Sequence, residues 1–106
     1  MRVLITKHFQ ERISKIKDRK QLAILLKKIK KIKEVGVRGM KRLLKAGNYI
    51  LLEEKVHRPP YRLYAVLDTK RKILYIVDWV HKKKQEKVIE KISSLLYKDL
   101  LELLSK

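Results

Sequence analysis

The 106-residue chain contains no cysteine, two prolines, three glycines and only 11 acidic residues against 29 lysines and arginines. The lack of cysteine excludes disulfides and cysteine-ligated zinc. The longest uncharged apolar runs, Leu22 to Leu26 and Ile73 to Val77, fall far short of the roughly 20 residues that span a bilayer. The first seven residues also contain too few apolar residues to form the hydrophobic region of a signal peptide. We therefore expect a cytoplasmic protein with no membrane partner.

Several motifs of metal and nucleotide chemistry are absent as well, namely HExxH, GxxxxGK[ST], GxSxG and an EF-hand loop. These patterns are typical of zinc proteases, P-loop enzymes, α/β-hydrolases and calcium-binding loops. We therefore predict neither a metal site nor a bound cofactor. One asparagine and three glutamines beside abundant lysine, isoleucine and leucine are typical of heat-adapted proteins.

What the sequence does contain is positive charge, with a formal net charge of +18 and 45% hydrophobic residues. This apolar content predicts one packed domain over residues 1–106 rather than a disordered basic tail. The charge exceeds the roughly 2 to 8 that keeps a small domain soluble, and it favours a polyanionic partner such as nucleic acid. Residues 1–48 have 16 basic and 3 acidic residues, whereas residues 85–106 have four of each. Lysine-rich helices that are merely well solvated are the alternative.

Apolar spacing divides the chain into short elements. Runs rich in β-branched and aromatic residues predict strands over residues 2–6, 49–56, 61–68 and 73–80. Apolar residues at helical spacing predict helices over residues 8–17, 22–34 and 84–104, the first capped by Thr6. Residues 40–45 form a basic connector or the start of another strand. The order predicts an α+β domain with an N-terminal strand, a helical hairpin, an antiparallel three-strand meander and a C-terminal helix, the helices covering one face of the sheet.

The predicted meander places the loop at residues 57–60 beside the end of the last strand. A two-residue turn between the last two strands would pair Arg62 with Trp79 and Tyr64 with Val77 on one face. That face would expose Arg62, Tyr64, Tyr75 and Trp79, a combination that suits RNA because bases stack on rings while phosphates meet cations. Packing of these rings against the final helix or a partner is the alternative.

One rim of this face should gather histidines and cations, and we predict that these residues bind or cleave RNA: Lys55, His57, Arg58, Arg62, His81, Lys82, Lys83 and Lys84. Cleavage through the 2′-hydroxyl of RNA needs a base, an acid and cations around the phosphate, without a metal. His57 and His81 are candidate acids or bases, although a surface or structural role is the alternative for each. Glu53 and Glu54 are adjacent in a strand and should point to opposite faces. Asp78 would need a buried partner that the sequence does not reveal.

The element order, the strand YRLYAVLD that begins with Tyr61-Arg62, and the segment ILYIVDWVHKKKQ that follows it resemble the RelE/ParE superfamily of toxins from type II toxin-antitoxin systems. Trp79 to Gln85 is similar to the end of the last strand in RelE- and HigB-type toxins. The resemblance implies a ribosome-dependent endoribonuclease that cuts mRNA in the A site without a metal. It also implies that Arg62 and Lys83 hold the scissile phosphate, with His81 and Lys82 as further catalytic candidates.

The chain departs from RelE proper at several positions. Ile50 and Leu52 stand where RelE has two lysines, and the tyrosine of its final helix falls on Ile89. Lys55, His57 or His81 would have to substitute. A ParE-like toxin that binds DNA gyrase without cleaving RNA is therefore an alternative, and a plain RNA- or DNA-binding domain is another.

The resemblance also implies partners. An acidic cognate antitoxin wraps toxins of this kind, and the ribosome and mRNA are their targets. Lys27, Lys28 and Lys31 lie on the outer side of the second predicted helix, where they would suit docking to ribosomal RNA. The last predicted helix contains more leucines than it needs to pack one of its faces against the sheet, namely Leu95, Leu96, Leu100, Leu101, Leu103 and Leu104. We expect some of these, above all Leu100 to Leu104, to meet a partner or a second copy of the chain. Completion of the core is the alternative, above all for Val88 to Leu96.

Overall fold

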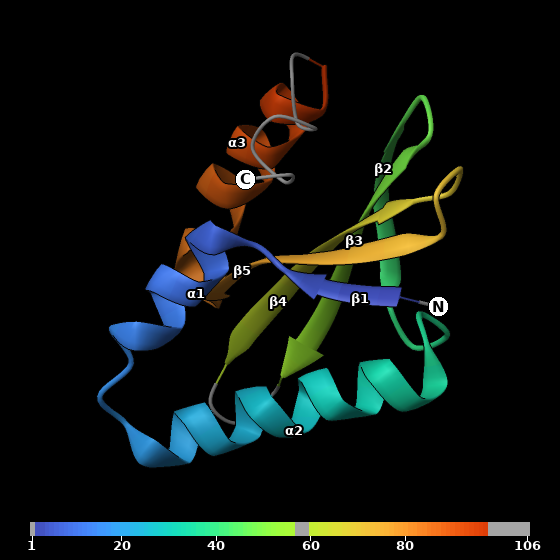
Figure 1. Cartoon of the computed structure of the whole chain (residues 1–106). Helices are drawn as coiled ribbons and strands as arrows, with labels where there is room; N and C mark the ends of the chain where they lie inside the picture. Colours follow the sequence, from blue (N-terminus) through green and yellow to red (C-terminus); the bar gives the residue numbers. More distant parts are fainter. Residues whose placement is uncertain (1, 57–59, 98–106) are drawn as a thin grey trace.

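The computed structural model describes residues 2–56 and 60–97, which form an α+β fold around one five-stranded sheet (Figure 1). The strands are β1 (Arg2–Ile5), β2 (Lys41–Ala46), β3 (Tyr49–Val56), β4 (Tyr61–Asp68) and β5 (Ile73–His81). The helices are α1 (Lys7–Ser14), α2 (Arg19–Val35), the short 3-10 helix η1 (Lys82–Lys84) and α3 (Gln85–Tyr97). The predicted fold class and element order are confirmed, and the basic connector proves to be a complete strand.

The strand order across the sheet is β1-β5-β4-β3-β2. Strands β2 to β5 form an antiparallel meander, which confirms the predicted three-strand meander and adds β2 at its edge. β1 instead pairs with β5 in parallel, from Arg2 opposite Ile73 to Ile5 opposite Ile76. The sheet is therefore mixed rather than antiparallel.

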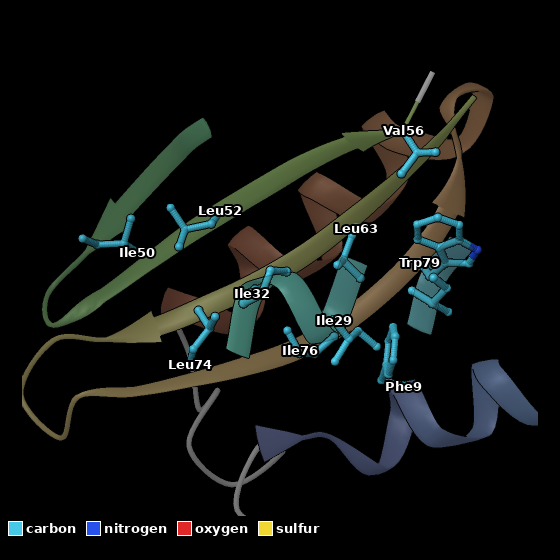
Figure 2. Packing of buried hydrophobic residues seen from close by; sticks show 12 residues of the cluster. Phe9, Ile29, Ile32, Ile50, Leu52, Val56, Leu63, Leu74, Ile76 and Trp79 are labelled. Atoms are coloured by element: carbon cyan, nitrogen blue, oxygen red, sulfur yellow. The ribbon is translucent and has the colours of Figure 1, made fainter. Parts of the chain in front are cut away.

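Helices cover both faces of this sheet. α1 and α2 lie on one face, where Phe9, Leu25, Ile29 and Ile32 pack against apolar side chains of β3, β4 and β5 (Figure 2). α3 lies on the other face, where Ile92 joins a second buried cluster (Figure 1). The prediction that all helices share one face is wrong, because β4 and β5 are apolar on both faces and both need cover.

The helix ends follow from local capping. The predicted cap is confirmed, since Thr6 Oγ1 accepts a hydrogen bond from the Phe9 backbone N–H at 3.2 Å. α2 begins three residues earlier than predicted because Asp18 accepts from the backbone N–H groups of Lys20 and Gln21. α2 ends at Gly36, whose φ of 75° is the left-handed conformation that glycine adopts without strain.

An irregularity in β5 alters the predicted pairing. Near the turn the predicted register holds, with Val66 opposite Tyr75. Between Tyr64 and Ala65 the register shifts by one, so that Val77 is an extra residue and Trp79 lies opposite Leu63 rather than Arg62. Because a one-residue slip turns every later side chain to the other face, Trp79 belongs to the cluster under α1 and α2.

The predicted exposed face of cations and rings is therefore wrong. Tyr64 and Trp79 are buried on opposite faces, and Tyr75 is buried near Tyr64 in the cluster under α3. For Tyr64 and Tyr75 the alternative, packing against the final helix, is confirmed. The predicted leucines from Leu95 to Leu104, and the extension of the last helix to residue 104, lie outside the side chains and residues that the structure describes.

Candidate functional site

Pro60, the described residue between β3 and β4, lies beside the end of β5, as predicted for this part of the connection. Tyr61 at the start of β4 pairs with His81, and the Lys82 backbone N–H donates to the Pro60 carbonyl at 2.9 Å. This hydrogen bond fixes the start of η1, whose three lysines are exposed. His57 and Arg58 lie outside the described residues.

The shift in β5 divides the predicted rim between the two faces. Arg62 pairs with Val80 on the α3 face, whereas His81 pairs with Tyr61 and lies on the face of α1 and α2. Arg62 and His81, two of the four candidate catalytic residues, therefore do not converge on one point, and Lys82 and Lys83 follow in η1. Two separate groups of side chains occupy the two sides of the same sheet end.

On the α3 face, Arg62 lies directly opposite Lys55 of β3. Arg62 is only 7% exposed, and its Nη1 donates to the Tyr61 carbonyl at 3.0 Å. Its buried Nε has no hydrogen-bond partner among the described residues. A buried charged donor without an acceptor is costly, and this group would gain from an anion bound beside it.

Next to Arg62 on β4, the buried Tyr64 hydroxyl donates to Glu53 Oε2 at 2.9 Å. Burial raises the pKa of Tyr64 well above its ordinary value, and the hydrogen bond to Glu53 raises it further. Tyr64 therefore remains a neutral donor that satisfies the buried carboxylate. Glu54 faces the other side, where it binds Lys28 at 3.4 Å, which confirms that the two glutamates point apart.

On the other face, aromatic rings form a small stack at the end of the sheet. The Tyr61 and Trp79 rings lie parallel with centroids 5.0 Å apart, and the His81 ring meets Tyr61 edge-on at 5.5 Å. Gln21 of α2 fixes both large rings, since its Oε1 accepts from Trp79 Nε1 and its Nε2 donates to the Tyr61 hydroxyl. His81 Nδ1 accepts from the Lys83 backbone N–H at 3.1 Å, so this nitrogen carries no proton in this arrangement.

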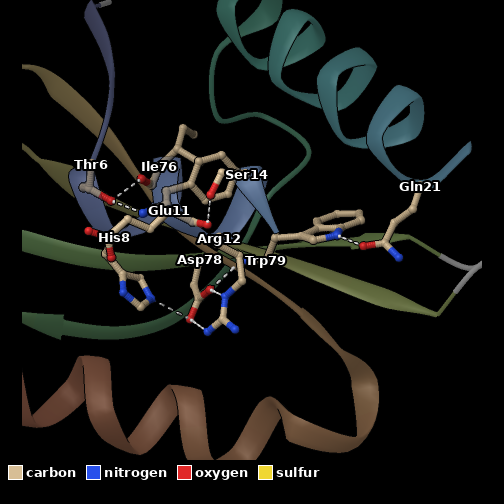
Figure 3. A network of polar contacts seen from close by, with 10 residues as sticks. Thr6, His8, Glu11, Arg12, Ser14, Gln21, Ile76, Asp78 and Trp79 are labelled. Atoms are coloured by element: carbon tan, nitrogen blue, oxygen red, sulfur yellow. Dashed lines mark hydrogen bonds and ion pairs between the residues drawn. The ribbon is translucent and has the colours of Figure 1, made fainter. Parts of the chain in front are cut away.

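Asp78 has the partner that the sequence did not reveal. Arg12 of α1 donates from Nε and Nη2 to its two carboxylate oxygens at 2.9 and 3.4 Å, and His8 Nε2 lies 3.4 Å from Oδ2 (Figure 3). The same carboxylate accepts from the Trp79 backbone N–H at 2.8 Å. Asp78 thus joins α1 to β5 at the point where the register shifts.

Between α1, the start of α2 and the end of β5 the surface forms an open pocket of about 310 Å³. Its lining combines basic, aromatic and aliphatic residues, namely Arg12, Lys15, Ile16, Lys17, Gln21, Tyr61, Trp79, Val80, His81 and Lys84. Four of these side chains are cations, and none is a carboxylate. The pocket therefore favours an anion.

The predicted lysines of α2 line a different hollow of about 490 Å³, together with Ile24, Lys30 and Glu34. Lys27 and Lys31 are exposed there, whereas Lys28 is held by Glu54. These lysines lie along α2, outside the group of residues that lines the pocket at the sheet end.

Three cationic residues of the pocket, Arg12, Lys15 and Lys17, are not among the predicted site residues. The sequence did carry a signal for one of them, because His8 and Arg12 are four residues apart and so share a helix face. That spacing, together with a carboxylate in need of a partner, could have suggested the contact with Asp78. Nothing in the sequence indicated that this face of α1 meets the end of β5.

The described residues contain neither a candidate metal-binding cluster nor a candidate membrane-spanning helix. Within residues 2–56 and 60–97, no three or more histidines, aspartates and glutamates are grouped as they would be around a metal ion. None of the helices in this part of the chain is long and apolar enough to cross a membrane.

The mixed sheet, the helices on its two faces and the element order define a small α+β domain with a RelE-like fold. A chain of the archaeal RelE–RelB complex from Pyrococcus horikoshii OT3 is similar to it, with a TM-score of 0.59 and 16% identity. The match covers 76% of this chain and 93% of that chain. No protein-family model and no curated protein sequence matches the chain. The predicted resemblance is therefore confirmed at the level of the fold.

Proposed function

We propose that this chain is the toxin of a toxin-antitoxin system and cleaves mRNA on the ribosome, in the cytoplasm, without a metal ion. Support comes from the RelE-like fold and, above all, from Arg62, a buried arginine at the sheet end whose Nε has no acceptor within residues 2–56 and 60–97. Lys55 lies opposite it, and the lysines of η1 begin where β5 ends. Such a group of cations stabilises the charge that develops on a phosphate during cleavage.

Roles follow from position. Arg62 and Lys83 hold the scissile phosphate, and Lys55 and Lys82 add positive charge near it. His81 lies on the other face and contributes to RNA binding rather than to the bond that breaks. His57 and Arg58 of the β3–β4 loop complete the RNA-binding set, with Lys84 and the α2 lysines Lys27, Lys28 and Lys31 as docking residues. Tyr64 and Trp79 are buried and support the site from within.

The proposed partners are a cognate acidic antitoxin, the ribosome and its mRNA. The net charge of +18 suits both an acidic protein and ribosomal RNA. The apolar residues near the C-terminus are proposed to meet the antitoxin or a second copy of the chain.

Expression of the chain followed by mapping of mRNA 5′ ends tests this proposal. We expect growth arrest and new 5′ ends within codons of translated messages, both abolished in Arg62→Ala/Lys83→Ala. Lys45→Ala/Lys70→Ala removes two exposed lysines at the opposite end of the sheet and should leave both effects intact. Folding of each variant is checked by the fluorescence of the single tryptophan, which is buried.

Other outcomes would overturn the proposal. Arrest without mRNA cleavage would indicate a non-catalytic toxin that acts on another target, such as DNA gyrase. Neither arrest nor cleavage, with retained RNA or DNA binding, would indicate a binding domain.

A further inference from the structure

We propose that the pocket between α1, α2 and the end of β5 binds a phosphate group of an RNA strand, at a position separate from the cleavage site around Arg62. The phosphate chemistry follows from the residues of the pocket itself. The choice of RNA rests on the proposed function.

The charge of the pocket is the first argument. Lys15, Lys17 and Lys84 are exposed, line the pocket, and form no ion pair with any residue that the structure describes. They approach it from two places, since Lys15 and Lys17 lie between α1 and α2 and Lys84 ends η1. An anion in the pocket would therefore meet positive charge from two separate segments of the chain, as in phosphate sites.

Arg12 supplies a positioned donor. Asp78 accepts from Nε and from Nη2, which leaves the two N–H groups of Nη1 and one of Nη2 as donors for a ligand in the pocket that Arg12 lines. An arginine already held by a carboxylate loses less side-chain freedom when it binds a phosphate.

The aromatic wall is equally fixed. Gln21 donates to the Tyr61 hydroxyl, so the proton of that hydroxyl remains available to a ligand. The stack of Tyr61 on Trp79 and the edge contact of His81 hold the wall in place. The partly exposed rings of this wall are Tyr61 and His81, with Trp79 buried behind them. Rings beside cations suit a nucleotide better than a bare ion, because a sugar or base can pack on them.

The position of the pocket explains how it would serve cleavage. The pocket and Arg62 lie on opposite faces of one sheet end, and Lys82 and Lys83 lie in η1, which follows β5 there. An RNA strand that passes around the end of β5 would meet both. The pocket would then add affinity, while the Arg62 side would act on the scissile phosphate.

Binding is measured without ribosomes, with a short single-stranded oligoribonucleotide as probe and the fluorescence of Trp79 or the anisotropy of a labelled RNA as readout. Lys15→Gln/Lys17→Gln should lower the affinity about tenfold and reduce the slope of log K against log salt by about one. Lys45→Gln/Lys70→Gln removes the same charge from the far end of the sheet and should change neither quantity. Inorganic phosphate should compete for the site in the unchanged protein but not in the pocket variant.

Equal losses in the two double variants would show diffuse charge attraction and overturn the proposal. If Lys15→Gln/Lys17→Gln lowers the affinity for the matching oligodeoxyribonucleotide as much as the affinity for RNA, the assignment to RNA is wrong. The assay scores no cleavage, so a chain that never cuts mRNA can still bind through this pocket, and a chain that cuts can fail this test. The two proposals therefore fail independently.

Discussion

Arg62 and His81 lie on opposite faces of the sheet, because Arg62 pairs with Val80 and consecutive residues of a strand point to opposite faces. The extra residue in β5 produces this separation, since without it both side chains would share one face. The relationship decides which residues can act on the same phosphate. It also provides a direct test of the roles proposed for them.

Substitutions at these two positions should have different kinetic effects. Arg62→Ala should lower the rate of mRNA cleavage at saturating ribosomes by about 100-fold or more, because a donor to the developing charge is lost. His81→Ala should raise the concentration needed for half-maximal cleavage and leave the saturated rate nearly unchanged. Single-turnover cleavage on programmed ribosomes measures both quantities. A folded His81→Ala protein with no cleavage at saturation would contradict the proposed division.

The burial of Trp79 predicts a large effect on stability. Trp79→Ala removes a ring that is 2% exposed and stacked on Tyr61, and it leaves Gln21 Oε1 without its donor. We expect the free energy of unfolding to fall by about 3–5 kcal/mol. Leu26→Ala is the control, because Leu26 is 50% exposed and its loss should cost less than about 1 kcal/mol. Urea unfolding followed by circular dichroism measures both, and equal effects would show that Trp79 is not a core residue.

Tyr64 should make stability depend on alkaline pH. Its folded pKa is raised above the ordinary value of 10.0, so the folded protein keeps a proton that the unfolded chain releases. The stabilisation is complete below that ordinary value and is lost as the pH rises above it. Tyr64→Phe, which leaves the buried Glu53 without its donor, should cost about 1–3 kcal/mol near neutral pH.

The difference in unfolding free energy between the unchanged protein and Tyr64→Phe should therefore shrink above about pH 10. Taking this difference cancels the titration of the lysines and of Tyr49, which both proteins share. A difference that stays constant into the alkaline range would show that Tyr64 is not protected from ionisation.

The contact between Arg12 and Asp78 should stabilise the packing of α1 on β5. Arg12→Ala removes two hydrogen bonds to a buried carboxylate, and we expect a loss of about 1–3 kcal/mol in unfolding free energy. Lys15→Ala is the matched control, since Lys15 is exposed and forms no ion pair with the described residues. Asp78→Asn in the Arg12→Ala background should recover part of the loss, because no unpaired charge is then buried. Independent, additive effects of the two substitutions would exclude this coupling.

Much of the fold could be predicted from local patterns. The helical spacing of apolar residues locates α1 and α2. Thr6 can be predicted as a cap because it carries a hydroxyl and directly precedes the first helix. Glu53 and Glu54 were placed on opposite faces because alternation along a strand is a local property. These features depend on residues close together in the sequence.

The candidate site could be predicted only in part. The meander places Pro60 and the start of β4 beside the end of β5, as expected from topology alone. The contact of α1 with Asp78, however, joins residues 66 positions apart, and it depends on how a helix packs across a strand. The pocket that contains Arg12, Lys15 and Lys17 therefore appears only in the folded chain.

The sequence by itself determined the order of the elements, the positive charge and the presence of Arg62 and His81 near one end of the sheet. Only the tertiary structure decided that these two residues face apart. β5 is apolar along most of its length and is buried on both sides, so it lacks the polar alternation that would reveal an extra residue. Packing against helices on both faces selects the register, and the shift in β5 separates the predicted rim into two sides, for which we propose cleavage and phosphate binding.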